Sequence, residues 1–143
     1  MTRKIVAVVI GVIVAVGLVF IVQTIGHNIY PVAGDVNVND KEQLAELIGR
    51  MPLGALLFVP ASWFAGAVGG GLVAVVTARG DQALLLAATV ATFILVAGGT
   101  TLIAIPHPIW LVITGIAAVL LSPFVACKLA ALLTSANRSP ASD

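Results

Sequence analysis

Charged residues and cysteine are both scarce in this chain of 143 residues. Asp, Glu, Lys and Arg together make up 9% of the sequence, whereas a typical soluble domain contains about 25%. The net charge of +1 provides no basic surface, so the sequence argues against a nucleic-acid partner. The one cysteine, Cys127, excludes a disulfide within the chain.

Acidic residues and known catalytic motifs are missing from the apolar parts of the sequence. Proton relays and many ion-coupled carriers use Asp or Glu inside the membrane, and none occurs in the four long apolar runs. The chain also has no Gly-rich phosphate loop, Cys-x-x-Cys, His-Glu-x-x-His or Gly-x-Ser-x-Gly motif. The sequence therefore identifies no catalytic residue and no cofactor, and it argues against a coupled transporter.

Apolar residues dominate what remains. They make up 60% of the sequence, and the mean hydropathy is +1.15. The excess lies in four runs, residues 5–26, 53–78, 83–105 and 109–133, each longer than the roughly 20 residues that cross a bilayer as a helix. Because these runs do not alternate apolar and polar residues, a membrane β-barrel is disfavoured. We predict an all-α, integral membrane four-helix bundle with antiparallel, up-down helices, forming a single domain over residues 1–143.

The first run has a signal-peptide alternative, since Arg3 and Lys4 precede it. The apolar part of a signal peptide is about 7–15 residues long, and residues 5–26 exceed that length. We therefore expect this segment to be retained as a membrane span.

The distribution of Lys and Arg predicts the orientation, because cytoplasmic loops carry an excess of both. One side of the predicted bundle carries five such residues, namely Arg3, Lys4, Arg79, Lys128 and Arg138. The other side carries two, Lys41 and Arg50. We expect both termini in the cytoplasm, with the protein in a cell membrane, and residues 31–52 outside.

Residues 31–52 form the largest predicted segment outside the bilayer, and residues 135–143 form a short polar tail. Asn39, followed three residues later by Glu42, is a candidate helix N-cap. Four apolar residues then share one face of residues 40–50 and their surroundings: Leu44, Leu47, Ile48 and Met51. This pattern predicts a short amphipathic helix, which lies either on the outer membrane surface or over the mouth of the bundle.

Small residues recur at three- and four-residue spacing within the spans, which places them on one face of a helix. Close packing drives helix association in lipid, and small side chains permit it. We predict packing contacts at Gly11, Ala15, Ser62, Gly66, Gly69, Gly70, Gly98, Gly99 and Gly115. Trp63, about halfway along residues 53–78, either packs against a small-residue neighbour or lines a pocket.

The two histidines, His27 and His107, are predicted at the outer ends of their spans. Imidazole is a common metal ligand and titrates near neutral pH, so the pair is a candidate metal or proton-handling site with Gln23 and Tyr30 beside it. Asp35, Asp40 and Glu42 are the candidate oxygen ligands from the loop. The alternative is that the histidines and their neighbours only anchor helix ends at the interface.

Several short motifs together resemble a family of small, uncharacterised four-helix membrane proteins of bacteria. They are Gly26-His27-x-x-Tyr30-Pro31, Leu53-Gly54-Ala55, the glycines of residues 53–78, and Pro106-His107-Pro108-x-Trp110. The resemblance covers most of the chain. It implies the same topology and a bacterial inner membrane, and it transfers no catalytic residue.

Three functional interpretations follow. The first is a non-enzymatic multi-pass protein that packs through small-residue faces, as a homo-oligomer or with a membrane partner protein. The second is a small oligomeric transport or metal-handling protein with His27 and His107 near its entrance. The third is a quinone-binding or enzymatic membrane subunit that uses the residues around His27 and Tyr30.

Overall fold

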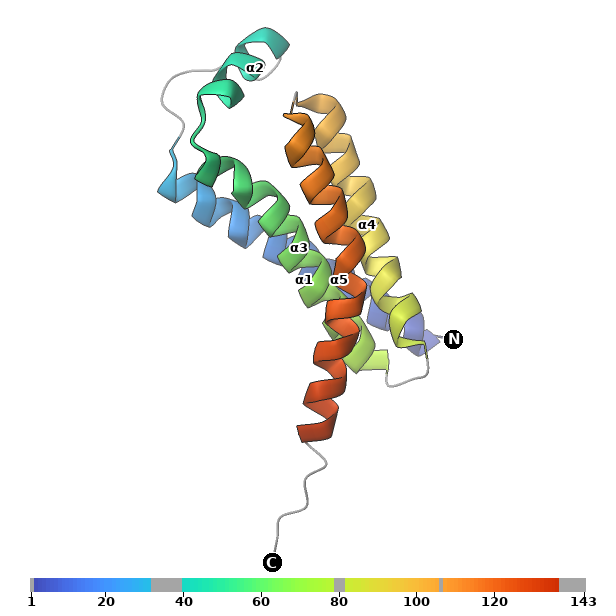
Figure 1. Ribbon diagram of the computed structural model, residues 1–143. Helices are drawn as coiled ribbons and strands as arrows, with labels where there is room; N and C mark the ends of the chain where they lie inside the picture. Colours follow the sequence, from blue (N-terminus) through green and yellow to red (C-terminus); the bar gives the residue numbers. More distant parts are fainter. Residues whose placement is uncertain (1, 32–39, 79–81, 106, 137–143) are drawn as a thin grey trace, which may run out of the picture.

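The computed structural model describes residues 2–31, 40–78, 82–105 and 107–136. Within these ranges the chain forms five α-helices (Figure 1), which are α1 (Thr2–Ile29), α2 (Lys41–Arg50), α3 (Leu53–Ala78), α4 (Ala83–Ala104) and α5 (Ile109–Ala136). Every one of them except α2 is long and apolar enough to cross a membrane. The prediction of an all-α protein with four membrane-length helices is confirmed.

The helix bounds differ modestly from the predicted spans. α1 extends the first span by three residues at each end, to Thr2 and Ile29. α5 continues to Ala136, so the first two residues of the predicted polar tail are helical. Residues 137–143 of that tail lie outside the described residues, as do residues 32–39 of the predicted loop and residues 79–81 between α3 and α4.

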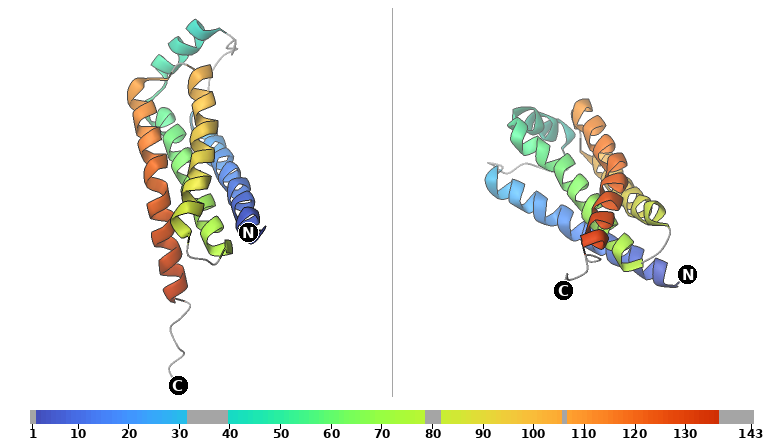
Figure 2. Two further views of the ribbon diagram at one scale, coloured as in Figure 1. Left: turned by 90° about the vertical axis from the view of Figure 1, so that its right-hand side faces the viewer. Right: turned by 60° about the horizontal axis from the view of Figure 1, so that its bottom comes forward.

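α3 is the central helix of the molecule, because it contacts α1, α4 and α5. α1 runs alongside α3, and α4 contacts both α5 and α1 (Figure 1). α2 lies beyond one end of the long helices, and the Thr2 end of α1 and the Ala136 end of α5 lie towards the opposite end (Figure 2). The core therefore forms along α3.

The contact between α1 and α3 is made of backbone against backbone. A Cβ atom built on Gly11 would lie 2.6 Å from the carbonyl oxygen of Gly70. One built on Gly66 would lie 2.8 Å from the carbonyl oxygen of Ala15. Ordinary van der Waals contact would need at least about 3.4 Å, so only glycine fits at these two positions. The small residues thus set how closely the two helices approach.

Elsewhere on α3 a bulky side chain, that of Trp63, fills the space between α3 and its neighbours α4 and α5. The indole ring of Trp63 is 4% exposed and lies against two glycines on different helices. A Cβ atom on Gly98 of α4 would be 2.9 Å from the indole Cζ2, and one on Gly115 of α5 would be 3.1 Å from Cε3. Trp63 therefore fills a slot that α4 and α5 leave open by lacking side chains there.

Two prolines, Pro60 and Pro123, lie inside helices that continue past them. Proline has no N–H, so Pro123 cannot donate the usual helical hydrogen bond to the carbonyl of Val119. The hydroxyl of Ser122 donates to that carbonyl instead, at 2.7 Å. Ser122 is fully buried, and this bond keeps the acceptor satisfied in an apolar surrounding.

α2 begins one residue later than Asn39 would place it. Asp40 is the N-cap, and its carboxylate accepts hydrogen bonds from the backbone N–H groups of Glu42 and Gln43 at 3.0 and 3.3 Å. A carboxylate at this position satisfies N–H groups that the first helical turn leaves unpaired. The interpretation of Asn39 as the cap was wrong. Leu44 and Ile48 are the buried residues of α2.

Candidate functional site

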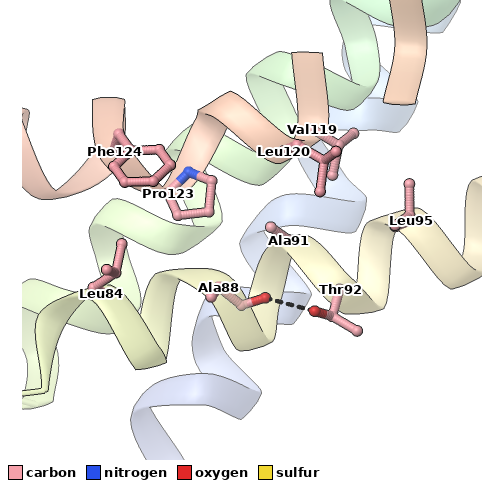
Figure 3. Close-up of a pocket in the computed structure, with 9 residues that line it drawn as sticks. All are labelled: Leu84, Ala88, Ala91, Thr92, Leu95, Val119, Leu120, Pro123 and Phe124. Carbon is pink, nitrogen blue, oxygen red and sulfur yellow. Dashed lines mark hydrogen bonds between the residues drawn. The ribbon is translucent and has the colours of Figure 1, made fainter. Parts of the chain in front are cut away.

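The first candidate site is an apolar groove between α4 and α5 with a volume of about 240 Å³. We call it the α4–α5 groove. Side chains of both helices face each other across it (Figure 3), and its lining consists of Leu84, Ala88, Ala91, Thr92, Leu95, Val119, Leu120, Pro123 and Phe124. It is lined by no charged residue, so its chemistry is that of contact with hydrocarbon or with another apolar helix.

Small residues form the α4 side of this groove. Ala88, Ala91 and Thr92 follow each other at three- and four-residue spacing, which places them on one helical face. The hydroxyl of Thr92 donates to the carbonyl of Ala88 at 2.9 Å (Figure 3), so it presents its methyl group without an unsatisfied donor. Leu120 and Phe124 of α5 are 58% and 62% exposed and flank the opening.

His27 lies on the exposed surface near the end of α1. It lines one hollow of about 160 Å³ with Gln23, Tyr30 and residues of α3, and a second of about 410 Å³ with other residues of α1. Among the described residues, neither lining includes His107. These hollows do join three of the predicted site residues, Gln23, His27 and Tyr30.

His107 is half-buried just before α5. Its ring Nδ1 lies 2.8 Å from the carbonyl oxygen of Ile105. A carbonyl only accepts, so in the neutral ring Nδ1 carries the proton and Nε2 is the free acceptor. In the described part of the chain no three His, Cys, Asp or Glu residues are grouped so as to hold a metal ion. Asp35, a candidate ligand, lies outside that part, and a site shared by the histidines stays a prediction.

Tyr30 and its neighbours pack at the end of the α1–α3 contact where α3 begins. The Tyr30 ring meets the Phe58 ring edge-on, with centroids 6.2 Å apart. Phe58 covers Gly26, where an added Cβ would lie 2.6 Å from its ring, and Tyr30 covers Gly54. Each of these aromatic rings contacts a glycine of the other segment, so the two contacts hold the end of α1 against the start of α3.

Gln23 connects α1 to the interior. Its amide donates to the hydroxyl of Ser62 at 3.2 Å, and Ser62 donates in turn to the carbonyl of Val59 at 2.7 Å. Ser62 is fully buried. This polar pair lies beside the glycine contact of the same two helices, and Gln23 faces a further hollow beyond it.

That further hollow has a volume of about 200 Å³ and lies between α1, α3 and α4. We call it the tryptophan hollow. It is lined by Val16, Val19, Gln23, Trp63, Ile94, Ala97, Gly98 and Thr101. Its polar groups come one from each helix, as Gln23, Trp63 and Thr101. Thr101 was missed in the sequence, where the only signal was that each of three spans carries a polar residue. Whether these three residues meet depends on how the helices are rotated, which the sequence does not show.

The residues predicted to pack differ in their surroundings. Besides the contacts of Gly11, Gly66, Gly70, Gly98 and Gly115 given above, Gly69 lies under the side chain of Leu18. Gly99 has no heavy atom within 4 Å of an added Cβ. Adjacent glycines on one helix point about 100° apart, and in this pair only Gly98 points at Trp63.

Comparison of the chain with family models, with curated proteins and with solved structures gives no match. The resemblance to small bacterial four-helix proteins therefore stays a prediction.

Proposed function

We propose that this protein is a non-enzymatic multi-pass membrane protein of the bacterial inner membrane that assembles, inside the bilayer, with a second copy of itself or with another membrane protein. The observation that supports this proposal is the α4–α5 groove. The small residues of the α1–α3 face, such as Gly11 and Gly66, already contact a neighbouring helix of the same chain. Ala88 is half-buried and Thr92 is exposed where they line this groove, and Ala91 beside them is buried.

The groove has the features that permit a further helix to dock. Lipid tails are as apolar as leucine, so helices gain from association mainly through closer packing and hydrogen bonding. Ala88 is small and half-buried, so it lets another backbone approach closely, and the exposed side chains of Leu120 and Phe124 offer apolar surface for the docked helix to pack against. A second copy of this chain is always present in the same membrane and can therefore occupy the groove.

Cysteine cross-linking at adjacent positions of α5 tests this assembly. Leu120 lines the groove, whereas Leu121 does not, and the two are 58% and 60% exposed. In a Cys127→Ala background we expect Leu120→Cys to give cross-linked dimers in native membranes, and Leu121→Cys to give none above background. Adding Ala88→Leu fills the groove and is expected to abolish the Leu120→Cys dimer.

The outcome separates the two kinds of partner. A Leu120→Cys adduct of a mass other than twice that of the chain would assign the groove to a different membrane protein. Equal dimer formation by both cysteines, unaffected by Ala88→Leu, would indicate random collision and would contradict assembly through the groove.

We also propose that the long helices alternate in direction across the bilayer with both ends of the chain in the cytoplasm. Arg3 donates to the carbonyl of Thr77 at 3.2 Å, and Lys4 donates to the side-chain carbonyl of Gln82 at 2.8 Å. The start of α1, the end of α3 and the start of α4 are thus gathered at one end. An excess of basic residues at that end supports its placement in the cytoplasm.

Labelling of single cysteines in spheroplasts checks this orientation. In a Cys127→Ala background, a membrane-impermeant maleimide is expected to label Ala45→Cys, an exposed position of α2, without lysis. Thr2→Cys, also exposed, is expected to react only after lysis. The reverse pattern would place α2 in the cytoplasm and overturn the proposed orientation.

A further inference from the structure

We propose that the tryptophan hollow is a binding site for a neutral, lipophilic carbonyl compound, whose carbonyl oxygen accepts a hydrogen bond from the indole N–H of Trp63. The proposal is independent of the α4–α5 groove and extends beyond assembly, because it assigns a ligand to a hollow formed by the helices of a single chain. It rests on the state of the Trp63 donor, on the polar groups around it and on the depth of the hollow.

The Trp63 side chain is buried as a whole, and its indole N–H has no partner among the described residues. The residue is 4% exposed. Its side chain appears in none of the hydrogen bonds of the described chain, yet no side-chain nitrogen or oxygen there is both fully enclosed and unpaired. The donor must therefore reach open space, and the hollow that Trp63 lines is that space.

The contacts of the ring show which edge faces the hollow. An added Cβ on Gly98 would lie 3.1 Å from Cε2 and 2.9 Å from Cζ2 of the indole. Cη2 is likewise 2.9 Å away, so Gly98 meets the benzene-ring carbons that lead to Cε2, the carbon bonded to Nε1, and this side of the indole lies towards α4. Gly98 lines the same hollow. In hydrocarbon an N–H without an acceptor is costly, so this edge favours a ligand that accepts.

Two more polar groups border the space. Gln23 uses one amide N–H on Ser62 at 3.2 Å, which leaves its carbonyl oxygen and its second N–H available. The hydroxyl of Thr101 lies 3.4 Å from the carbonyl of Ala97, a long contact that it can exchange for a better acceptor. A few convergent polar groups in an apolar surrounding are the usual composition of a small-molecule site.

Charge, size and depth define the class of ligand. No charged side chain lines the hollow, and Val16, Val19 and Ile94 provide apolar walls, so the ligand is neutral and largely apolar. A volume of about 200 Å³ holds a ring or the end of a chain, and not a whole lipid. Trp63 is ten residues from the start of α3 and Gly98 is six residues from the end of α4, about 15 and 9 Å along these helices, which places the hollow below the interface and inside a hydrocarbon layer about 30 Å thick.

Two membrane components offer such a carbonyl. One is a lipid-soluble quinone, whose ring carbonyls reach the middle of the bilayer. The other is the acyl ester of a phospholipid, whose carbonyl lies nearer the surface and would have to be drawn inward. The depth of Trp63 favours the quinone type, and both share the hydrogen bond to Nε1.

The two tryptophans of the chain, Trp63 and Trp110, make the test direct. Protein labelled with ¹⁵N-tryptophan in lipid nanodiscs gives two indole N–H signals in NMR, and a Trp110→Phe variant assigns them. In nanodiscs of ether-linked lipids, which lack acyl carbonyls, we titrate decylubiquinone. We expect the Trp63 indole signal to shift downfield and to saturate, while the Trp110 signal stays in place. Decylbenzene, which has no carbonyl, is expected to cause no such shift.

A matched pair of variants locates the ligand within the hollow. Thr101→Val removes a hydroxyl that lines the hollow without changing side-chain size, and is expected to weaken decylubiquinone binding about threefold to tenfold. Thr100→Val alters the neighbouring residue, whose hydroxyl is bonded to Ala97 at 2.6 Å outside the lining, and is expected to leave binding unchanged.

Each outcome decides the proposal. A Trp63 signal that differs between ester-linked and ether-linked nanodiscs, with no further response to the quinone, supports the site and identifies lipid esters as its source of carbonyls. A Trp63 signal that is the same in both lipids and does not respond saturably to decylubiquinone overturns the site. A saturable shift that Thr100→Val weakens as much as Thr101→Val does would place binding elsewhere and also overturn it.

Discussion

Trp63→Ala is expected to lower the free energy of unfolding by about 3–5 kcal/mol, the range observed when a buried aromatic side chain is truncated. The indole fills a slot between Gly98 and Gly115. Neither glycine has a side chain that could move into the space, so the cavity would persist. The measurement is the loss of helical structure during titration with SDS from mild detergent micelles.

The other tryptophan provides the control for this substitution. Trp110 is 39% exposed at the start of α5, so Trp110→Ala is expected to cost about 1 kcal/mol or less. Trp63→Phe keeps an aromatic ring in the slot and is expected to fall between the two alanine variants. Equal losses for Trp63→Ala and Trp110→Ala would show that the slot does not hold α4 and α5 against α3.

Gly70→Ala is expected to destabilise the protein by about 3 kcal/mol, at the upper end of the usual range for overpacking. The added methyl group would collide with the backbone oxygen of Gly11 and would lie 2.6 Å from the Cβ of Ala15. A backbone oxygen cannot rotate away as a flexible side chain can, so α1 and α3 would have to separate. The same SDS titration measures the loss.

Gly17 gives a matched comparison, because it lies on α1 and has no heavy atom within 4 Å of an added Cβ. Gly17→Ala is expected to change stability by no more than about 0.5 kcal/mol. If Gly70→Ala were as well tolerated as Gly17→Ala, the close approach of α1 to α3 would not be the contact that stabilises the fold.

The existence and length of the four long helices could be predicted because hydropathy and length constrain them strongly. α3 begins at Leu53 and ends at Ala78, as its apolar run does. At α2 the prediction failed by one residue, since Asn39 and Asp40 are both good N-cap residues and the sequence does not choose between them. Such one-residue differences follow from local competition between similar side chains.

Helix rotation was the part that the sequence constrained least. In a soluble helix the polar face reveals the exposed side, but in lipid both faces are apolar. Gly98 and Gly99 are therefore equivalent in the sequence, although only Gly98 meets a neighbour in the structure. The spacing of small residues did place Gly66 and Gly70 together, because the four-residue interval is independent of rotation.

Helix rotation also decided which candidate sites could be predicted from the sequence. Gln23, His27 and Tyr30 follow one another within about two helical turns at the end of α1, so their grouping could be predicted from spacing alone. Trp63 and Thr101 belong to different helices, and their meeting with Gln23 depends on how three helices rotate and cross. A site assembled from three spans leaves no local pattern in the sequence.

α3 packs against α1 through glycines and against α4 and α5 through Trp63, and this separation has a consequence for biosynthesis. Gly66, Gly69 and Gly70 face α1, which is translated earlier, and Trp63 faces α4 and α5, which are translated later. Chains are synthesised from the N-terminus and their parts fold in that order. When α3 enters the membrane, α1 is already there to form the glycine contact. The indole of Trp63 is then in place before α4 and α5 arrive and pack against it. The order of translation and the order of packing coincide, because each of α3, α4 and α5 has an earlier-translated helix to pack against when it enters the membrane.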